Sequence, residues 1–167
     1  IFSDTLRFEN KEKNMFEDAV ALYKSGDLIA SRDYFIEIVN QSPKTEFSKQ
    51  SLFYLGKIGK ELSGKFEKES IEYFSKTSLM YSNTDVALEA LSENASLYKD
   101  SGNYESLERV YSKILSDFPA HISAERFYFE YYDFTHDFEK KEDIFFKYAE
   151  NFQYSPRSGE MYTNMFN

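Results

Sequence analysis

The sequence predicts an all-α fold of stacked antiparallel helix pairs. The first observation behind this prediction is the stretch 22–43, LYKSGDLIASRDYFIEIVNQSP. It reads as the end of one helix, a tight turn at Gly26, and a second helix that Pro43 terminates. Glycine adopts the left-handed conformation that ends helices, and proline cannot continue their hydrogen-bond ladder. The second observation is that the stretch 98–119, YKDSGNYESLERVYSKILSDFP, repeats this pattern.

The third observation is the spacing of these turns. Gly26 and Gly102 are separated by 76 residues, and His136 takes the same turn position 34 residues after Gly102. A period near 34 with two helices in each repeat is typical of helical repeat arrays. Because such arrays bind through surfaces that the fold does not identify, this pattern constrains function only by class.

The first two repeats are justified by apolar residues at helical spacing between turn residues. The first pair spans 11–25 and 28–41, and its inner faces carry Met15, Ala19, Leu22, Ser31, Phe35, Ile38 and Val39. The second pair spans 45–62 and 67–81, with a turn at Ser63-Gly64 and with Leu52, Leu55, Gly56, Ile58, Ser70 and Phe74 inside. We expect Gly56 to let a facing helix approach closely.

The remaining elements follow the same rules. The third pair spans 85–101 and 104–117, and the fourth spans 121–135 and 138–152, before Ser155-Pro156 ends it. The residues 157–167 form a tail with Met161, Tyr162, Met165 and Phe166 at the spacing of a short packing helix. Before the first pair, 1–10 forms a lead-in segment, either a short helix or the end of a linker.

Composition excludes several function classes. The 167 residues suit one domain or one short array, and no run approaches the ~20 apolar residues of a membrane span. The net charge of −9 disfavours nucleic acid and anionic membrane surfaces as partners. The absence of cysteine excludes disulfides and thiolate chemistry. Because the chain begins at Ile1, we interpret it as a trimmed piece, from which any signal peptide or lipid anchor would have been lost upstream.

These residues resemble the tetratricopeptide repeat (TPR), whose pattern needs a bulky residue, a Leu-Gly pair, an aromatic, a small residue, an aromatic and a proline at set offsets. The matching positions in the first three repeats are Met15, Ala19, Leu22, Gly26, Ser31, Phe35 and Pro43; Leu55, Gly56, Phe66, Ser70 and Phe74; and Leu91, Ala95, Tyr98, Gly102, Tyr104, Leu107, Tyr111 and Pro119. The resemblance covers 11–154 and implies a right-handed superhelix of about four antiparallel helix pairs. The fourth repeat has Phe129, Lys141 and Tyr148 at small-residue positions, which suggests a terminal, capping repeat.

A finer resemblance lies in the run from Pro43 to Phe47 followed by Phe53-Tyr54-Leu55-Gly56. It is similar to the "Pro-x-Ser-x-Tyr…Tyr-x-Leu-Gly" variant of bacterial envelope proteins, namely the Tol-Pal cell-division coordinator and the TPR lipoprotein of the β-barrel assembly machinery. This similarity implies a periplasmic scaffold at the outer membrane. A cytosolic regulatory TPR module is the alternative.

In TPR arrays the first helix of each pair lines a concave groove, and the resemblance carries this face over by position. Among the residues on it, we expect Phe16, Tyr23, Phe53, Lys57, Lys60 and Arg126 to contact a partner. Apolar rings beside lysines suit a helix or an extended peptide that carries an acidic group. The alternative is that the lead-in segment covers these rings.

A second candidate surface is the aromatic block 127–154. Phe127, Tyr131 and Phe134 lie on a helix that is aromatic on nearly every side, so the helix is expected to be buried all round. A terminal repeat has only one neighbour. Either the tail covers the open face, or another protein or a second copy of the chain does, which makes homo-oligomerisation an alternative function.

Catalytic signals are weak. His121 and His136 have 14 residues between them and no partner at metal-ligand spacing, and the acidic cluster 133–143 lacks the glycine of a calcium loop. The sequence has no Gly-x-Ser-x-Gly elbow and no phosphate-binding glycine loop. We therefore expect no enzyme activity, no metal and no cofactor. The predicted function is a non-catalytic protein-interaction scaffold, with another protein or peptide segment as its partner.

Overall fold

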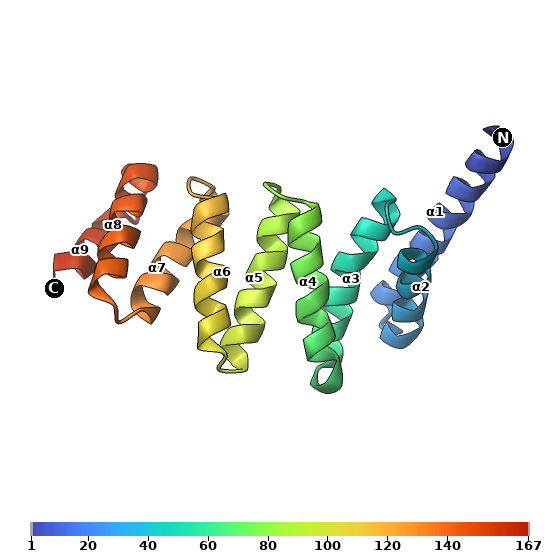
Figure 1. Cartoon of the computed structure of the whole chain (residues 1–167), viewed down its shortest axis with the longest axis horizontal. Coiled ribbons are helices and arrows are strands. Elements are labelled where there is room, and N and C mark those ends of the chain that lie inside the picture. Colours follow the sequence, from blue (N-terminus) through green and yellow to red (C-terminus); the bar gives the residue numbers. More distant parts are fainter. Residues whose placement is uncertain (1, 167) are drawn as a thin grey trace. The chain divides into compact units, whose positions relative to one another are not determined.

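The computed structural model describes the backbone of residues 2–166 and the side chains of residues 10–166. Within this range every regular element is helical, and consecutive helices are joined by short turns (Figure 1). The prediction of an all-α fold of helix pairs is confirmed. The helices are α1 Phe2–Ser25, α2 Leu28–Gln41, α3 Glu46–Leu62, α4 Glu67–Met80, α5 Asp85–Asp100, α6 Tyr104–Asp117, α7 Glu125–Phe134, α8 Phe138–Phe152 and α9 Ser158–Phe166.

Two helix starts differ from the predicted ones. Helix α1 begins at Phe2, so 2–10 continues the first helix and is not a separate element; Ile1 lies outside the described residues. Helix α7 begins at Glu125, because Ile122–Ala124 forms a 3-10 helix in front of it. The His121 ring nitrogen accepts a hydrogen bond from the backbone of Ser123 at 3.2 Å and so starts that turn.

The chain forms two compact units, Ile1–Leu97 and Tyr98–Asn167, with the division inside α5. We call them unit 1 and unit 2 and describe each by itself. In unit 1, helices α1 to α4 pack as neighbours along the chain, and α1 also touches α3. In unit 2, α6 packs on α7, α7 on α8, and α8 on α9.

The turns that the sequence identified have the expected chemistry. Gly26 and Gly102 have φ angles of +87° and +69°, in the left-handed region that glycine adopts at no steric cost. The next residue caps the following helix in each case. Asp27 accepts a hydrogen bond from the backbone of Ala30, and Asn103 accepts one from Ser106, both at 3.2 Å.

The core of unit 1 depends on small residues between paired helices. The Ser31 hydroxyl donates to the carbonyl of Ala19 at 2.8 Å and links α2 to α1. The Ser70 hydroxyl donates to the carbonyl of Gly56 at 2.6 Å and links α4 to α3. A Cβ atom on Gly56 would lie 2.7 Å from the Phe74 ring, which is closer than van der Waals contact allows. The close approach expected at Gly56 is confirmed.

The core of unit 2 is aromatic. Tyr148 of α8 is fully buried between α7 residues, with its ring 5.3 Å from Phe129 and 5.7 Å from Tyr128. Its hydroxyl donates to the buried carboxylate of Glu125 at 2.8 Å. The hydroxyl of Ser155 donates to the same carboxylate from the loop after α8. In this helix pair, large rings whose hydroxyls are hydrogen-bonded therefore stand where the helix pairs of unit 1 have small residues.

Candidate binding groove

Two rows of side chains face each other in unit 1 between α3 and α5. The α3 row runs through Gln50, Phe53, Lys57 and Lys60, at the spacing that keeps residues on one helix face. At one end the ammonium of Lys60 lies 2.6 Å from the carboxylate of Glu93 on α5. We call the strip between these two helices the groove, and its α3 side carries three of the predicted contact residues, namely Phe53, Lys57 and Lys60.

A cavity opens at the other end of this groove. It has a volume of about 250 Å³ and is lined by Glu46, Gln50, Phe53, Tyr54, Tyr81 and Val86. Most of its wall is apolar and three of its six residues are aromatic. That volume accommodates a bulky side chain of a partner, whereas small-molecule sites of drug size are usually larger.

The carboxylate of Glu46 forms the polar end of the cavity. The Tyr81 hydroxyl donates to it at 2.6 Å, and the amide of Gln50 donates to it at 3.5 Å. The hydrogen bond from Tyr81 lowers the pKa of Glu46 below its ordinary value, and nearby Lys49 acts in the same direction. Burial, together with this carboxylate, raises the pKa of Tyr81. The cavity therefore has a fixed negative charge beside an uncharged phenol at neutral pH.

The predicted basic character of the groove is reduced by pairing. Lys60 is held by Glu93 and also lies 3.4 Å from the hydroxyl of Ser96. The ammonium of Lys57 lies over the Phe53 ring, 5.4 Å from its centroid, in a cation–π contact. Neither lysine therefore extends freely toward the middle of the groove.

The α1 residues of the predicted surface are half-buried packing residues. The ring of Phe16 contacts Phe35, Phe47 and Tyr54, with centroids 5.7, 5.3 and 6.0 Å away. The ring of Tyr23 lies 5.4 Å from Tyr54, and its hydroxyl donates to Glu61. Both rings therefore join α1 to α3, and only part of each is open to a partner. The alternative that residues 1–10 cover them involves side chains outside the described range, apart from Asn10.

The residues predicted to form the second surface are mostly interior to unit 2. Phe127 is 2% exposed and Tyr131 is 6% exposed, and both rings pack on Tyr111 of α6. Phe134 is half-buried and also packs on Tyr111. Arg126, which was predicted for the groove face and not for this surface, belongs to unit 2 and is exposed, with its guanidinium 4.5 Å from the centroid of the Phe127 ring. The expected contact surface of Phe127 and Tyr131 is thus a packed core of α6 and α7, because aromatic rings from both helices meet there.

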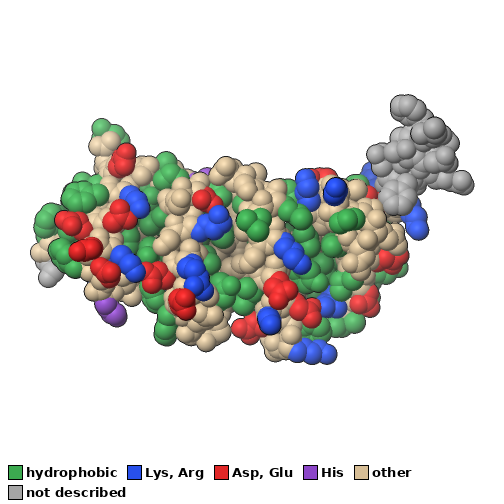
Figure 2. Space-filling model, viewed as in Figure 1, with side chains coloured by type: hydrophobic (Ala, Val, Ile, Leu, Met, Phe, Trp, Pro, Cys, Tyr) green, Lys and Arg blue, Asp and Glu red, His purple; other side chains and the backbone are tan. Residues whose placement is uncertain are grey.

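The tail covers the other side of this aromatic block, which is one of the two alternatives that the sequence left open. Met161 of α9 is fully buried, and the Tyr132 hydroxyl donates to the backbone carbonyl of Asn164 at 3.0 Å. Where α8 meets α9, the ring of Phe145 packs on Phe146, Tyr162 and Phe166. Figure 2 shows hydrophobic side chains at the surface over these helices. The exposed rings are Phe146 at 60%, Tyr162 at 41% and Phe166 at 78%.

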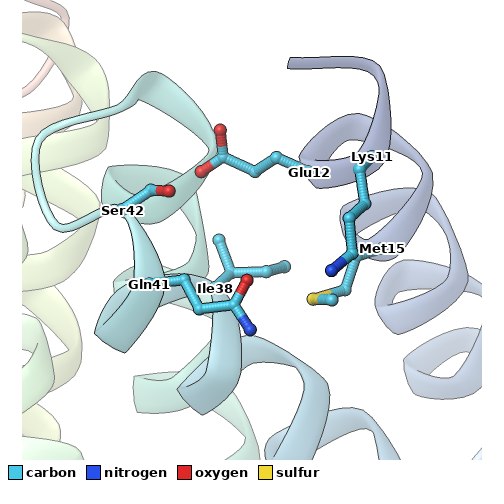
Figure 3. Close-up of a pocket in the computed structure, with 6 residues that line it drawn as sticks. All are labelled: Lys11, Glu12, Met15, Ile38, Gln41 and Ser42. Carbon is cyan, nitrogen blue, oxygen red and sulfur yellow. The ribbon is translucent and has the colours of Figure 1, made fainter. Parts of the chain in front are cut away.

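A second, much smaller cavity lies between α1 and α2 (Figure 3). Its volume is about 10 Å³, which suffices for about one water molecule. In Figure 3 the carboxylate of Glu12 points toward the hydroxyl of Ser42, above the apolar side chains of Met15 and Ile38. Glu12 also accepts a hydrogen bond from the Thr45 hydroxyl that caps α3. This cavity therefore belongs to the packing of the α2–α3 turn.

Among residues whose placement is described, no three histidine or carboxylate side chains gather as metal ligands would. None of the described helices combines the length and the hydrophobicity that crossing a membrane requires.

The sequence did not predict four of the six residues that line the cavity. The TPR resemblance places Gln50 and Phe53 on the groove face by position, but not Glu46, Tyr54, Tyr81 or Val86. Val86 could have been found, because it lies three residues before Glu89, which the same resemblance places on the groove face. The sequence carries no such signal for Tyr81. This residue follows the last residue of α4, and the direction of its side chain depends on how the chain turns toward α5.

No family model matches the sequence, and no curated protein matches it. Solved structures do match. A tetratricopeptide repeat protein from Parabacteroides merdae superposes with a TM-score of 0.68 at 17% identity, over 93% of this chain and 59% of that protein. BtubC (BKLC) from P. vanneervenii gives a TM-score of 0.60 at 12% identity, over 98% of this chain and 74% of that protein.

A putative kinesin light chain from Podosopora anserina with TPR-like repeats gives a TM-score of 0.55 at 12% identity. That match covers 93% of this chain and 83% of the other. The chain thus spans less than two thirds of the length of the Parabacteroides protein and more of the other two. At these identities the likeness concerns the fold alone. The fold is that of TPR-like repeat proteins, which commonly act as protein-interaction scaffolds.

Proposed function

We propose that the chain is a non-catalytic scaffold that binds a segment of a partner protein in the groove between α3 and α5 of unit 1. The observation that carries the proposal is the cavity at Phe53, Tyr54 and Val86, an apolar recess flanked by polar groups. Such recesses accept the anchoring side chains that contribute most of the affinity of protein interfaces. The remaining groove residues would fix the direction of the bound segment.

The walls of the groove are held before any partner arrives. The Tyr81–Glu46 hydrogen bond joins the end of α4 to the start of α3, and the Lys60–Glu93 ion pair joins α3 to α5. Phe53 packs on the fully buried ring of Phe74, with centroids 5.8 Å apart. A preformed surface leaves only the partner segment to lose conformational entropy on binding.

The proposal includes a setting in the bacterial cell envelope, as a periplasmic assembly factor associated with the outer membrane. The support is the similarity of Pro43 to Phe47 and of Phe53-Tyr54-Leu55-Gly56 to the envelope TPR variant. The similarity concerns α3, the helix that carries the groove. A cytosolic regulatory TPR module would use the same groove with a different partner.

Site-specific photo-crosslinking in cells of the source organism tests the proposal. A photoreactive amino acid replaces Gln50, which is exposed and lines the cavity. The control carries it at Glu72, which is exposed on α4 and lies outside the cavity lining. We expect a specific protein adduct from position 50 and none from position 72, because only the former faces the bound segment.

The crosslinked partner also decides the setting. A periplasmic or outer-membrane protein would support the envelope assignment, and a cytosolic protein would overturn it while leaving the groove in place. Equal adducts from both positions, or none from position 50, would contradict groove binding.

Homo-oligomerisation is a second candidate function, favoured by the exposed rings of Phe146, Tyr162 and Phe166 at the α8–α9 surface. If a second copy covers this surface, sedimentation equilibrium of the wild type will give a mass that rises with concentration. Phe146→Glu would then restore the monomer mass, because a carboxylate cannot be buried there without a partner. A constant monomer mass for the wild type would remove this candidate.

A further inference from the structure

Helix α9 is attached to the rest of unit 2 by few contacts. Met161 is fully buried, Ser158 and Met165 are half-buried, and the other residues of α9 are exposed. From α7, the Tyr132 hydroxyl donates to the backbone carbonyl of Asn164 at 3.0 Å. Because a helix of nine residues is too short to be stable in water by itself, these contacts have to hold α9 in its helical state.

The loop before α9 is tied to the start of α7 by a buried carboxylate. Glu125, which is 8% exposed, accepts hydrogen bonds from the hydroxyls of Tyr148 and Ser155. The Ser155 hydroxyl also accepts a hydrogen bond from the backbone N–H of Arg157 at 3.1 Å. Ser155 therefore links α7 to the turn from which α9 starts, whereas Tyr148 links α7 to α8.

Arg157 makes a second connection to the same turn. Its guanidinium lies 3.7 Å from the centroid of the Phe129 ring on α7, in a cation–π contact. The same guanidinium donates two hydrogen bonds, at 3.0 and 3.1 Å, to the carboxylate of Glu160 in the first turn of α9. Two links, one through Ser155 and one through Arg157, thus join α7 to the beginning of α9, and the first of them ends on a buried carboxylate.

Helix α8 is held more firmly than α9. Its buried residues are Ile144, Phe145, Tyr148 and Phe152, whereas α9 has one. Elements with few buried contacts open first in local unfolding, while the remaining core stays folded. Opening of α9 alone would uncover the rings of Tyr132 and Phe145, both of which contact α9.

We infer that α9 is a releasable strap: it opens and closes as one element over the aromatic face of α7 and α8, and the hydrogen bond from Ser155 to Glu125 is the latch that keeps it closed. The inference concerns unit 2 alone and does not depend on the groove of unit 1. Closing the strap keeps apolar rings out of water, and opening it exposes them while α7 and α8 stay folded. The latch thereby determines for what fraction of the time this aromatic face is accessible.

Hydrogen–deuterium exchange of the full chain, measured by mass spectrometry after pepsin digestion, tests the strap. Exchange of the α9 amides reports opening of the strap, and exchange of the α8 amides reports opening of the core of unit 2. In the wild type we expect the α9 amides to exchange at least about tenfold faster, relative to an unfolded chain, than the α8 amides, because local opening releases only α9.

Two variants each remove one donor from Glu125, but on different sides. Ser155→Ala should speed exchange of α9 about three- to tenfold and leave α8 unchanged, because it breaks the bond to the loop and keeps the bond to α8. Tyr148→Phe should give the opposite pattern, with faster exchange in α8 and little change in α9. Met161→Ala should speed exchange of α9 more than Ser155→Ala does, since it removes the buried anchor. Glu150→Gln, on the exposed face of α8, is the control and should change neither helix.

Equal protection of α9 and α8 in the wild type would overturn the strap, since α9 would then open only together with the rest of unit 2. Exchange of α9 that Ser155→Ala leaves unchanged would overturn the latch. Trypsin gives an independent check, because Arg157 is the last basic residue of the sequence and cleavage after it releases residues 158–167. That fragment should form faster from Met161→Ala than from the wild type, and equal rates would contradict opening of the strap.

Discussion

The two compact units join their helix pairs by opposite means. In unit 1 the contact between α3 and α4 depends on a missing side chain, because the Phe74 ring occupies the place where Gly56 would carry a Cβ atom. In unit 2 the contact between α7 and α8 depends on the large rings of Phe129 and Tyr148, 5.3 Å apart. Helix pairs with the same repeat spacing therefore pack in two ways, one with a missing side chain at the contact and the other with large rings there.

The polar groups of the two junctions follow from this difference. In unit 1 short hydroxyls reach the backbone of the facing helix, as Ser70 reaches the carbonyl of Gly56 at 2.6 Å. In unit 2 the helices are held apart by rings, and the polar contact passes through the Tyr148 hydroxyl to the Glu125 side chain at 2.8 Å. The comparison predicts that adding atoms at the α3–α4 contact lowers the stability of unit 1, whereas removing atoms from the α7–α8 contact lowers the stability of unit 2.

The largest expected effect is from Tyr148→Ala in unit 2. The substitution removes a fully buried ring that packs on Phe129, Tyr128 and Phe152, and it leaves the Glu125 carboxylate with one donor fewer. Loss of a large aromatic side chain from a core costs about 3–5 kcal/mol of unfolding free energy. Urea denaturation followed by circular dichroism measures the loss. A cost below about 1 kcal/mol would show that the ring does not hold α7 and α8 together.

Gly56→Ala tests the opposite sensitivity in unit 1. One added methyl group would lie 2.7 Å from the Phe74 ring, so either the ring or α4 must shift. Such overpacking typically costs about 1–3 kcal/mol, although alanine is the better helix former. The same denaturation experiment gives the value. An unchanged or raised stability would mean that the α3–α4 contact is looser than the Gly56–Phe74 geometry requires.

Local chemistry explains why the sequence predicted most of the fold. The turn at Gly26 and the caps at Asp27 and Asn103 depend on a few adjacent residues, so their patterns are visible without a structure. The extension of α1 back to Phe2 was not visible, because residues 1–10 contain cap-like residues and no clear apolar period. A helix start without a strong local signal is a weak feature of any sequence.

The candidate site was predictable only where helical spacing determines it. Spacing placed Gln50, Phe53 and Lys57 on one face of α3, and the structure has them along the groove. The burial of Phe127 and Tyr131 could not be predicted in the same way, because a helix with rings on every side has no distinguishable outer face. The charge available along the groove could not be predicted from the sequence either, since Lys60 pairs with Glu93, which lies 33 positions away.

Alkaline pH should reveal the buried tyrosines that distinguish unit 2. Burial raises the pKa of Tyr128 and of Tyr148 from 10.0 to about 12. A raised folded-state pKa contributes stability that is present below pH 10 and lost as the pH rises toward 12, because the unfolded chain ionises first. Each of these tyrosines should cost about 1.4 kcal/mol by pH 11.

The measurement is the unfolding free energy at pH 8 and at pH 11 for the wild type and for Tyr148→Phe. The variant starts less stable at pH 8, since Glu125 loses a donor, but it should lose about 1.4 kcal/mol less between the two pH values. Equal losses in both proteins would show that the Tyr148 hydroxyl ionises as readily in the folded state as in the unfolded chain.

The smallest expected effect is from Gly159→Ala, which is the matched control for Gly56→Ala. Gly159 is also helical, in α9, but a Cβ atom there would have no neighbour within 4 Å. Alanine should therefore stabilise the chain. The gain should be smaller than the roughly 1 kcal/mol of a helix interior, because the site lies in the first turn. Opposite signs for the same substitution at positions 56 and 159 would attribute the cost at Gly56 to the Phe74 ring. A loss at both positions would instead point to a general requirement for flexible backbone, and the packing explanation for unit 1 would fail.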